Sequence, residues 1–296
     1  MNPIRIGTRG SRLALVQANW VVERLREVAP EKDFSVVVID SKPKLDRSNP
    51  NLGEGIFVKE IQSALLDDRI DVAVHSLKDL PTKPVEGLVV AAVPERADAR
   101  EAMIGTSLDA LPNGAKVGTS SPRRLAQIKR LRSDLEVVPL NGNIPTRLQK
   151  IARGDCDAAM VAAAGLQRLG IEAAQILPFE QALPAPGQGA LALEVRTGPL
   201  EIPLIIGGID HIQSAVATAA EREVLAALGG GCMLPVAVLA TIDDGQIEIQ
   251  ARVVSADGTR EAFHRATGDG GFPHEVAEQV AAALIEQGAK DLLGLS

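Results

Sequence analysis

Aromatic residues are scarce in this chain of 296 residues, which contains one Trp, five Phe and no Tyr. Hydrophobic residues still make up 46% of the sequence, so its cores must be built from Ala, Val, Leu and Ile. An excess of basic residues is also missing: the net charge is −7, whereas a general nucleic-acid binder needs a basic surface to displace counterions. The composition therefore predicts a globular protein of two or three domains with no nucleic-acid partner.

Several other classes are excluded by missing patterns. No run reaches the roughly 20 apolar residues of a membrane span, and the first residues lack the apolar segment of a signal peptide. The two cysteines, Cys156 and Cys232, lie far apart and the four histidines are scattered, so we expect neither a disulfide framework nor a metal site. No P-loop is present, and no GxGxxG follows a strand. These absences predict a soluble, cytoplasmic protein that binds no membrane, metal or nucleotide.

Hydrophobic periodicity predicts alternating strands and helices over the first half of the chain. Strands are expected at residues 4–8, 34–39, 71–75, 89–93, 102–104, 116–118, 135–139 and 158–162. Helices are expected at residues 12–28, 57–68, 122–131 and 145–153. This alternation favours a doubly wound α/β architecture, and the β-branched run 34–39 is typical of a buried parallel strand. Residues 41–55 are polar and contain Pro43 and Pro50, which predicts a long loop of the kind that often forms a lid.

The pattern changes near residue 217. A helix is expected at 215–228, and Gly229-Gly230-Gly231-Cys232 then interrupts it. Strands are expected at 236–241, 246–254 and 261–266, joined by Asp-Gly turns, and a helix over 274–293 closes the chain. We therefore predict a small α+β domain over residues 217–296.

Three predicted strands are followed by a polar turn, an arginine and a helix start. The three segments are Thr8-Arg9-Gly10-Ser11, Gly118-Thr119-Ser120-Ser121-Pro122-Arg123-Arg124 and Asn141-Gly142-Asn143-Ile144-Pro145-Thr146-Arg147. Helix N-termini offer backbone N–H groups to anions, and arginine binds carboxylates through two hydrogen bonds. Because ligands of doubly wound sheets bind beyond the carboxyl ends of the strands, one crevice for a ligand with several carboxylates or phosphates is indicated. Ordinary capped helices with solvated arginines are the alternative interpretation.

Two further residues are chemical candidates. Asp79, in His75-Ser76-Leu77-Lys78-Asp79, follows a strand and is able to stabilise a developing cation or move a proton; capping the next turn is its alternative role. Cys232 follows three glycines, which permit a bulky group to approach closely, so its thiol is a candidate nucleophile or attachment point. A small residue in a turn is the other interpretation, and Cys156 is expected to be core.

Taken in chain order, these segments resemble the hydroxymethylbilane synthase (porphobilinogen deaminase) family over nearly the whole sequence. The matching pieces also include Gln17, Phe57-Val58-Lys59-Glu60, Leu80-Pro81, Leu148, Ala164-Gly165-Leu166-Gln167-Arg168, Pro186-Gly187-Gln188-Gly189-Ala190 and Ala220-Glu221-Arg222. The resemblance implies a monomeric transferase of porphyrin and heme (tetrapyrrole) biosynthesis. It condenses four porphobilinogen units into hydroxymethylbilane, releasing ammonia each time, on a dipyrromethane cofactor attached covalently through Cys232.

The resemblance also implies a fold and a role for each residue. Two doubly wound domains similar to periplasmic binding proteins are expected, domain 1 at 1–98 and 192–216 and domain 2 at 99–191, before the small third domain. Asp79 is the catalytic residue that stabilises the azafulvene cation formed on deamination. The cofactor-binding residues implied are Cys232, Ser76, Lys78, Thr119, Ser121, Arg123, Arg124 and Asn143. The substrate-binding residues implied are Arg9, Ser11, Gln17, Phe57, Arg147, Arg168 and Gln188.

The sequence departs from the family pattern mainly at positions expected to act in elongation, the addition of further pyrrole units. Asn141 stands where the family usually has arginine, Glu54 reverses a charge, and Pro50 replaces a lysine. Compensating contacts from Lys42, Lys44 or Arg12 are one interpretation. A non-elongating or altered paralogue that binds the cofactor or oligopyrroles is a second, and a non-enzymatic polycarboxylate-binding protein is a third.

Overall fold

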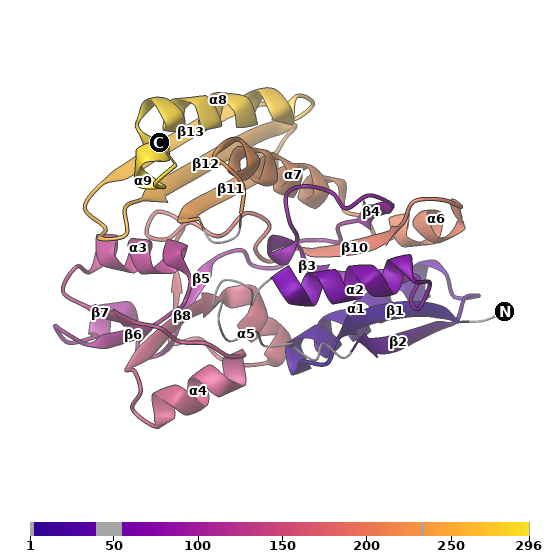
Figure 1. The fold of residues 1–296 in the computed structure, drawn as a ribbon, viewed down its shortest axis with the longest axis horizontal. Helices are drawn as coiled ribbons and strands as arrows, with labels where there is room; N and C mark the ends of the chain where they lie inside the picture. Colours follow the sequence, from indigo (N-terminus) through magenta and orange to yellow (C-terminus); the bar gives the residue numbers. More distant parts are fainter. Residues whose placement is uncertain (1–2, 40–54, 232–233, 296) are drawn as a thin grey trace. The chain divides into compact units, whose positions relative to one another are not determined.

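The computed structural model describes residues 3–39, 55–231 and 234–295. The chain forms two compact units, and each unit uses two separate stretches of sequence (Figure 1). The first unit is Met1–Arg96 with Ala190–Ala215, and the second is Ala97–Gly189 with Val216–Ser296. The chain therefore leaves each unit and later returns to it, a feature typical of folds in which one strand of a sheet is contributed from far away in the sequence.

The first unit contains a five-stranded mixed sheet with the order β2-β1-β3-β10-β4. Its strands are β1 (Ile4–Arg9), β2 (Phe34–Ile39), β3 (Val72–Ser76), β4 (Leu88–Ala92) and β10 (Leu191–Arg196). Strand β1 is parallel to β2 and β3, whereas β10 is antiparallel to both β3 and β4. Only β10 therefore runs against the others.

Helices cover both faces of this sheet because side chains alternate along each buried strand. Val72 and Val74 pack into the core with residues of α1 (Arg12–Val28) and α6 (Glu201–Gly207). Ala73, between them, packs instead with residues of α2 (Gly55–Leu66). The short 3₁₀ helix η2 (Leu77–Asp79) follows β3 directly, so the strand end carries Lys78 and Asp79.

The second unit contains a sheet with the same arrangement, in the order β7-β6-β8-β5-β9. Its strands are β5 (Glu101–Gly105), β6 (Lys116–Gly118), β7 (Glu136–Val138), β8 (Ala158–Ala162) and β9 (Gln175–Leu177). Strand β6 is parallel to β7 and β8, and β5 is antiparallel to β8 and β9. Helices α3 (Pro122–Leu131), α4 (Ile144–Ala152) and α5 (Ala163–Leu169) follow the three parallel strands β6, β7 and β8.

A three-stranded antiparallel sheet completes the second unit. Strands β11 (Val236–Asp243), β12 (Gln246–Val254) and β13 (Glu261–Asp269) pair in sequence order. Helix α8 (Pro273–Glu286) packs over β12 and β13 (Figure 1), and α7 (Ile212–Ala227) shares their aliphatic core. The predicted fold class, two doubly wound α/β sheets with a small α+β part at the C-terminus, is confirmed. The three domain boundaries stay a prediction.

The expected closing helix over 274–293 is wrong in its length. Helix α8 ends at Glu286, and Gly288 has φ +85°, a left-handed conformation that favours glycine. The short helix α9 (Ala289–Leu292) follows the break. Strand 34–39 is parallel as expected but is only partly buried: β2 lies at the sheet edge, Phe34 and Ile39 are buried, and Val38 is 45% exposed. Helices α5 and α6 and strands β9 and β10 were not predicted.

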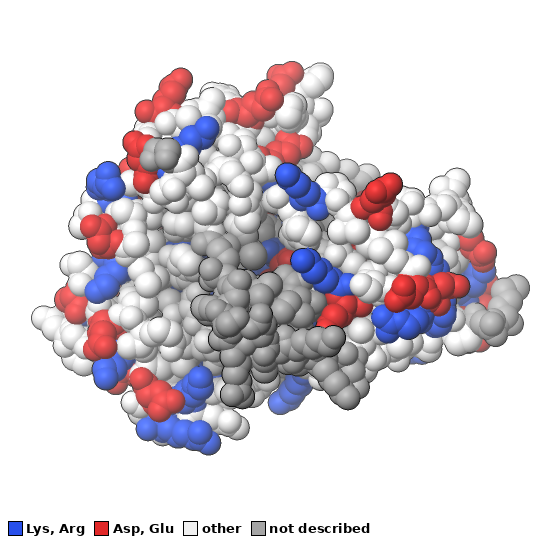
Figure 2. Space-filling view, in the orientation of Figure 1, with Lys and Arg blue, Asp and Glu red and all other residues white. Residues whose placement is uncertain are grey.

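The exposed surface carries both signs of charge. Among the described residues of the face drawn in Figure 2, Lys and Arg are interspersed with Asp and Glu. Some form ion pairs, for example Lys32 with Glu201 at 2.9 Å and Arg132 with Asp134 at 2.7 Å. Exposed pairs add little to stability. Within the described residues, no single helix has the length and apolar character to cross a membrane; α6 and α7 pass that test only jointly, as a pair bent by 104°.

Candidate active site

Candidate residues from the sequence lie at the carboxyl ends of parallel strands in both sheets. In the first unit, Arg9 ends β1 and Ser76 ends β3. In the second, the segment 119–124 follows β6, the segment 141–147 follows β7, and Arg168 lies on α5 after β8. The carboxyl ends of parallel strands meet at one edge, which is where ligands bind in open α/β sheets. Each unit therefore gathers its own candidates at one edge of its sheet.

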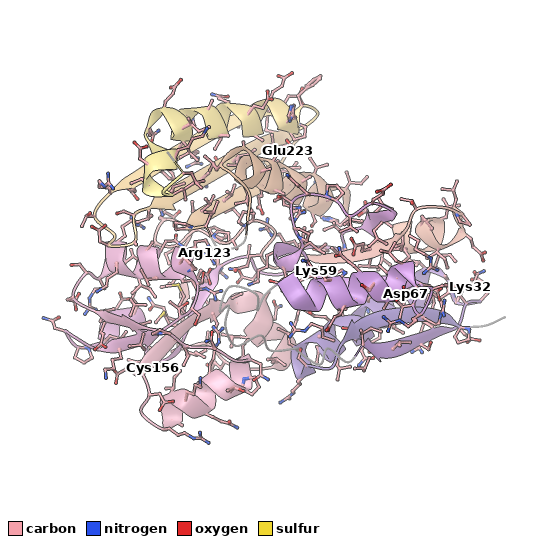
Figure 3. All side chains as sticks on the ribbon, viewed as in Figure 1. Lys32, Lys59, Asp67, Arg123, Cys156 and Glu223 are labelled. Carbon is pink, nitrogen blue, oxygen red and sulfur yellow. The ribbon has the colours of Figure 1, made fainter. Side chains whose placement is uncertain are left out.

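Arg9 is a partly buried cation whose charge interacts with two carboxylates of the first unit. Burial lowers the pKa of its guanidinium, and the negative charges of Asp79 and Glu60 oppose that change. Asp79 is exposed on η2, and Glu60 lies on α2 next to Lys59, which Figure 3 labels. One cation and two carboxylates therefore act on each other here, an arrangement that is able to bind an anionic group and also to stabilise a nearby positive charge.

A hydrogen bond joins Gln17 to Ser76. The buried Gln17 amide donates from Nε2 to Ser76 Oγ at 3.2 Å, which connects α1 to the end of β3. Ser11 caps α1, because its Oγ accepts a hydrogen bond from the Ala14 N–H at 3.3 Å. The sequence analysis placed Gln17 with the substrate and Ser76 with the cofactor; the structure brings them into direct contact.

Arg123 and Arg124 share one buried carboxylate. The Arg123 side chain, labelled in Figure 3, lies 2.5 Å from Glu101 Oε1 through Nη2, and Arg124 lies 2.9 Å from Oε2 through its own Nη2. Arg123 also donates from Nη1 to the Leu183 carbonyl at 2.8 Å. Glu101 is 0% exposed, Arg123 5% and Arg124 8%. Burial lowers the pKa of Arg123, the Glu101 carboxylate raises it, and Arg124 lowers it further.

The helix starts predicted at two turns are confirmed. Ser121 caps α3 by accepting a hydrogen bond from the Arg124 N–H at 3.5 Å, and the buried Thr119 Oγ1 accepts from the Ser121 N–H at 3.2 Å. Asn143 caps α4, since its Oδ1 accepts from the Thr146 N–H at 2.9 Å. Both helices have proline in the first turn, where its missing N–H costs nothing.

Two cations of α4 bond back to the turn between β7 and α4. Arg147 donates from Nε to the Gly142 carbonyl at 2.9 Å. Lys150 donates from Nζ to the Asn141 carbonyl at 3.2 Å. Lys150 was not a candidate from the sequence, yet its ammonium is hydrogen-bonded to the residue at which the expected arginine is missing. Position 141 therefore has a positive charge beside it.

Arg168 is a partly buried cation bound to a neutral acceptor. Its Nη2 donates to the Gly189 carbonyl at 2.8 Å, and burial lowers its pKa to about 10. The neighbouring Gln188 is fully buried, and its Nε2 donates to the Ala99 carbonyl at 2.8 Å. A cation that has lost part of its hydration is stabilised when an anionic group approaches it, so Arg168 favours a carboxylate-bearing ligand.

Some candidates lie outside the described residues. These are Cys232, the side chain of Phe57, and Pro50, Glu54, Lys42 and Lys44 of the segment 40–54. Cys156, labelled in Figure 3, packs in the second unit's core, where burial raises the pKa of its thiol. Its expected place in the core is confirmed.

The family model described as "Porphobilinogen deaminase, dipyromethane cofactor binding domain" matches residues 4–203. The chain belongs to the porphobilinogen deaminase family. A second model, the porphobilinogen deaminase C-terminal domain, matches residues 215–287. The relative named porphobilinogen deaminase from Corynebacterium efficiens is 44% identical over 98% of this chain and 99% of its own length. Those from Brevibacillus brevis (99% and 97%) and Thermus thermophilus (99% and 99%) are also 44% identical.

Similarity to solved structures is more distant. A putative methionine-binding lipoprotein from Bacillus subtilis is 13% identical, with a TM-score of 0.44, over 72% of this chain and 93% of its own. The porphobilinogen deaminase family models locate the candidates more directly. Every candidate from Arg9 to Gln188 lies inside the match to the dipyrromethane-binding domain, and Cys232 lies inside the match to the C-terminal domain.

Three buried acids of this porphobilinogen deaminase family member were missed by the sequence analysis. Glu101 pairs with two arginines, and Glu194 on β10 faces His75 of the first unit. Glu221 on α7 accepts hydrogen bonds from the Gly187 N–H at 2.6 Å and the Ala240 N–H at 2.8 Å. Glu101 and Glu194 are each the only acid in a mostly apolar strand, which is a usable signal because a buried carboxylate requires a partner. Glu221 is followed by Arg222 and Glu223 in α7 and carries no such signal.

Removing the charge of Glu101 is expected to destabilise the second unit strongly. Glu101→Gln keeps the shape but leaves two buried guanidinium groups without a counter-ion, and breaking a buried pair in this way costs about 3–5 kcal/mol. For a unit of this size that corresponds to a melting temperature lower by roughly 6–20 °C, measured by calorimetry. Asp134→Asn, which removes an exposed partner of Arg132, is the control and should change the melting temperature little. Equal effects of the two variants would show that Glu101 does not neutralise the arginines.

Proposed function

We propose that this chain joins four porphobilinogen units into hydroxymethylbilane on a dipyrromethane that is attached through Cys232. Its family membership gives the enzyme class, a transferase of tetrapyrrole biosynthesis. The observation that carries the finer proposal is the set of cations at the strand ends of both sheets, all within the match to the cofactor-binding domain. That the enzyme acts as a cytosolic monomer stays a prediction.

The residues of the second unit suit a ligand with several carboxylates. Two arginines share the single charge of Glu101, so the group keeps one net positive charge. Helices α3 and α4 begin in the same unit, and the partial positive charge of a helix N-terminus favours an anion. We assign the cofactor carboxylates to Thr119, Ser121, Arg123, Arg124 and Asn143, with Ser76 and Lys78 from the first unit. When bound, the dipyrromethane supplies the pyrrole carbon to which the first substrate unit is joined.

The incoming porphobilinogen and the growing chain are assigned to Arg9, Arg147 and Arg168. Arginine suits their acetate and propionate groups because its guanidinium forms paired hydrogen bonds with a carboxylate. Gln17 and Phe57 are assigned as further contacts. The side chains of Ser11 and Gln188 are already bonded to backbone groups, so we assign them a supporting role at the helix start and at the Gly189 turn.

Asp79 is assigned the chemical step. The C–N bond of porphobilinogen breaks with its electron pair going to nitrogen, which leaves as ammonia and leaves a cation on the pyrrole. An exposed carboxylate at the end of β3 is able to approach that cation, and a fixed charge aimed at developing charge is usually the largest single contribution to catalysis. Arg9, whose charge interacts with that of Asp79, belongs to the same part of the site.

Incubation of the purified protein with porphobilinogen tests the proposal. We expect hydroxymethylbilane in solution and, in the intact-protein mass, an adduct of two pyrrole units that persists on denaturation. An adduct without released product would support the altered paralogue instead. Reversible binding without an adduct or product would support a non-enzymatic polycarboxylate-binding protein, and the proposal would be wrong.

Lys150 is expected to support elongation in place of the arginine missing at position 141. Each added pyrrole brings more carboxylates, so Lys150→Gln should slow the later additions by roughly fivefold, the effect of one partly screened charge of about 1 kcal/mol. Protein masses with one to three added units should then persist when porphobilinogen is limiting. Lys116→Gln, at the opposite end of β6, is the control and should leave the mass distribution unchanged. The same distribution in both variants would remove Lys150 from elongation.

A further inference from the structure

A polar trio is buried in the layer between the first sheet and α2. It consists of His75 on β3, Glu194 on β10 and Gln62 on α2, and all three are at most 5% exposed. Gln62 Nε2 donates to Glu194 Oε1 at 3.0 Å. The second carboxylate oxygen, Oε2, lies 3.1 Å from His75 Nε2. One carboxylate therefore contacts a helix through one oxygen and a neighbouring strand through the other.

The surroundings of the trio are apolar. Ile61, Leu65, Ala73 and Leu88 form the core of this layer, and Val58 and Ala192 extend it towards the end of β3. Replacing a buried ionic group in such surroundings by an apolar side chain is often neutral or stabilising. Stability alone therefore does not account for three polar side chains here.

The trio is also incompletely satisfied. The contact between His75 Nε2 and Glu194 Oε2 has an ion-pair distance but lies outside hydrogen-bond angles, and neither atom has another hydrogen-bond partner among the described residues. Buried polar atoms are rarely left in this state, because each costs free energy. In the pairing of β10 with β4 the register shifts between Leu193 and Glu194, and such irregularities often re-aim a side chain next to an active site.

The two elements that Glu194 joins both carry charges that act on Arg9. Glu60 is two residues before Gln62 on α2, and Asp79 is four residues after His75 at the end of β3. Both carboxylates raise the pKa of Arg9. The hydrophobic effect is non-directional, whereas polar contacts to the two oxygens of one carboxylate specify how a helix is placed against a strand. We propose that Glu194 is a positioning residue, which holds α2 and the end of β3 in the register that sets Glu60 and Asp79 around Arg9.

This inference rests on the proposed function for its kinetic consequence. Asp79 works only if its carboxylate is placed against the cation that forms, and a displacement of about 1 Å at such a group can cost on the order of 10²-fold in rate. Glu194→Met, which conserves volume and removes both contacts, should therefore lower kcat by roughly 10–10²-fold and change KM much less. Glu194→Gln, which keeps an acceptor for Gln62, should recover most of kcat.

Arg196→Met is the matched control. Arg196 lies two residues after Glu194 on β10 and also holds α2, but at its far end, by donating to the Leu65 carbonyl. Its replacement should lower the melting temperature and leave kcat unchanged. Equal losses of kcat in Glu194→Met and Arg196→Met would mean that any loosening of α2 has this effect. That result, or an unchanged kcat in Glu194→Met, would overturn the proposal.

Hydrogen exchange gives a readout that does not depend on turnover. In Glu194→Met, amide protection should fall in α2 and at residues 76–80 and be retained in β1, because only the link between the first two is lost. If the natural protein fails to turn over porphobilinogen, the proposed function fails while this measurement still decides the link. Unchanged exchange in α2 would show that Glu194 does not hold it.

Discussion

Cys232→Ser is expected to yield a protein that carries no pyrrole adduct and forms no hydroxymethylbilane. A thioether needs a thiolate nucleophile, and a serine hydroxyl stays protonated at neutral pH and is far less nucleophilic. The backbone before this position is unusual: Gly229, Gly230 and Gly231 have φ of +111°, +63° and +123°. A side chain added at Gly231 would meet nothing within 4 Å. The three residues before Cys232 therefore have backbone conformations that favour glycine.

The intact-protein mass reports whether the adduct is present, and an assay for hydroxymethylbilane reports whether product forms. The unloaded variant should also melt several degrees lower, since the arginines at the strand ends lose the carboxylates that the ligand brings to them. Cys156→Ser is the control: that thiol lies in the core of the second unit, and loading and turnover should stay normal. Full activity in Cys232→Ser would place the attachment point elsewhere.

Local sequence signals predicted the helix starts and strand ends that carry the candidate residues. Ser121-Pro122 and Asn143 with Pro145 were predicted to start helices, and both caps are present, because a cap depends on residues only three apart. The same holds for the three strands β1, β6 and β7, which were predicted: Arg9 ends β1, and the turns after β6 and β7 lead to Arg123 and Arg147. Charged side chains at these ends were therefore predictable from sequence order alone.

The antiparallel placement of one strand in each sheet was not predictable in this way. Strand β10, which was not predicted, enters the first sheet between β3 and β4 after the chain has passed through the whole second sheet. Strand β5 was predicted over residues 102–104, but its antiparallel position between β8 and β9 was not. The neighbours of both strands are set by long-range packing rather than by periodicity. No element was predicted over residues 191–196, and nothing indicated that Glu194 has a partner 132 residues away.

The partners of the charged side chains were the other feature that only the structure shows. The sequence indicated two arginines open to a ligand at the start of α3, whereas the structure bonds both to Glu101 on a different strand. Lys150 was overlooked for the reverse reason: it lies nine residues from Asn141, and only the turn of α4 brings its ammonium to that carbonyl. In both cases the residue types were evident and the partners were not.

Asp79→Asn is expected to lower kcat by about 10²–10³-fold while the fold and the cofactor adduct are retained. The amide has the shape of the carboxylate but no charge, so the cation left by ammonia is no longer stabilised. Asp79 is exposed on η2 and is held by its backbone at the end of β3, so its replacement leaves the core intact. Loss of its charge should also lower the pKa of Arg9 further, since Asp79 now raises it.

Two further variants test whether the effect depends on a carboxylate at position 79 or on the net charge of the first unit. Asp79→Glu keeps the carboxylate but moves it by one methylene, and it should recover part of kcat. Asp67→Asn removes an exposed acid elsewhere in the first unit, labelled in Figure 3, and should leave kcat unchanged. Steady-state kinetics with porphobilinogen, with the intact mass checked for the adduct, measures all three. A kcat of Asp79→Asn within a few-fold of the natural protein would mean that another group stabilises the cation, and Glu60, the second carboxylate acting on Arg9, would be the residue to replace next.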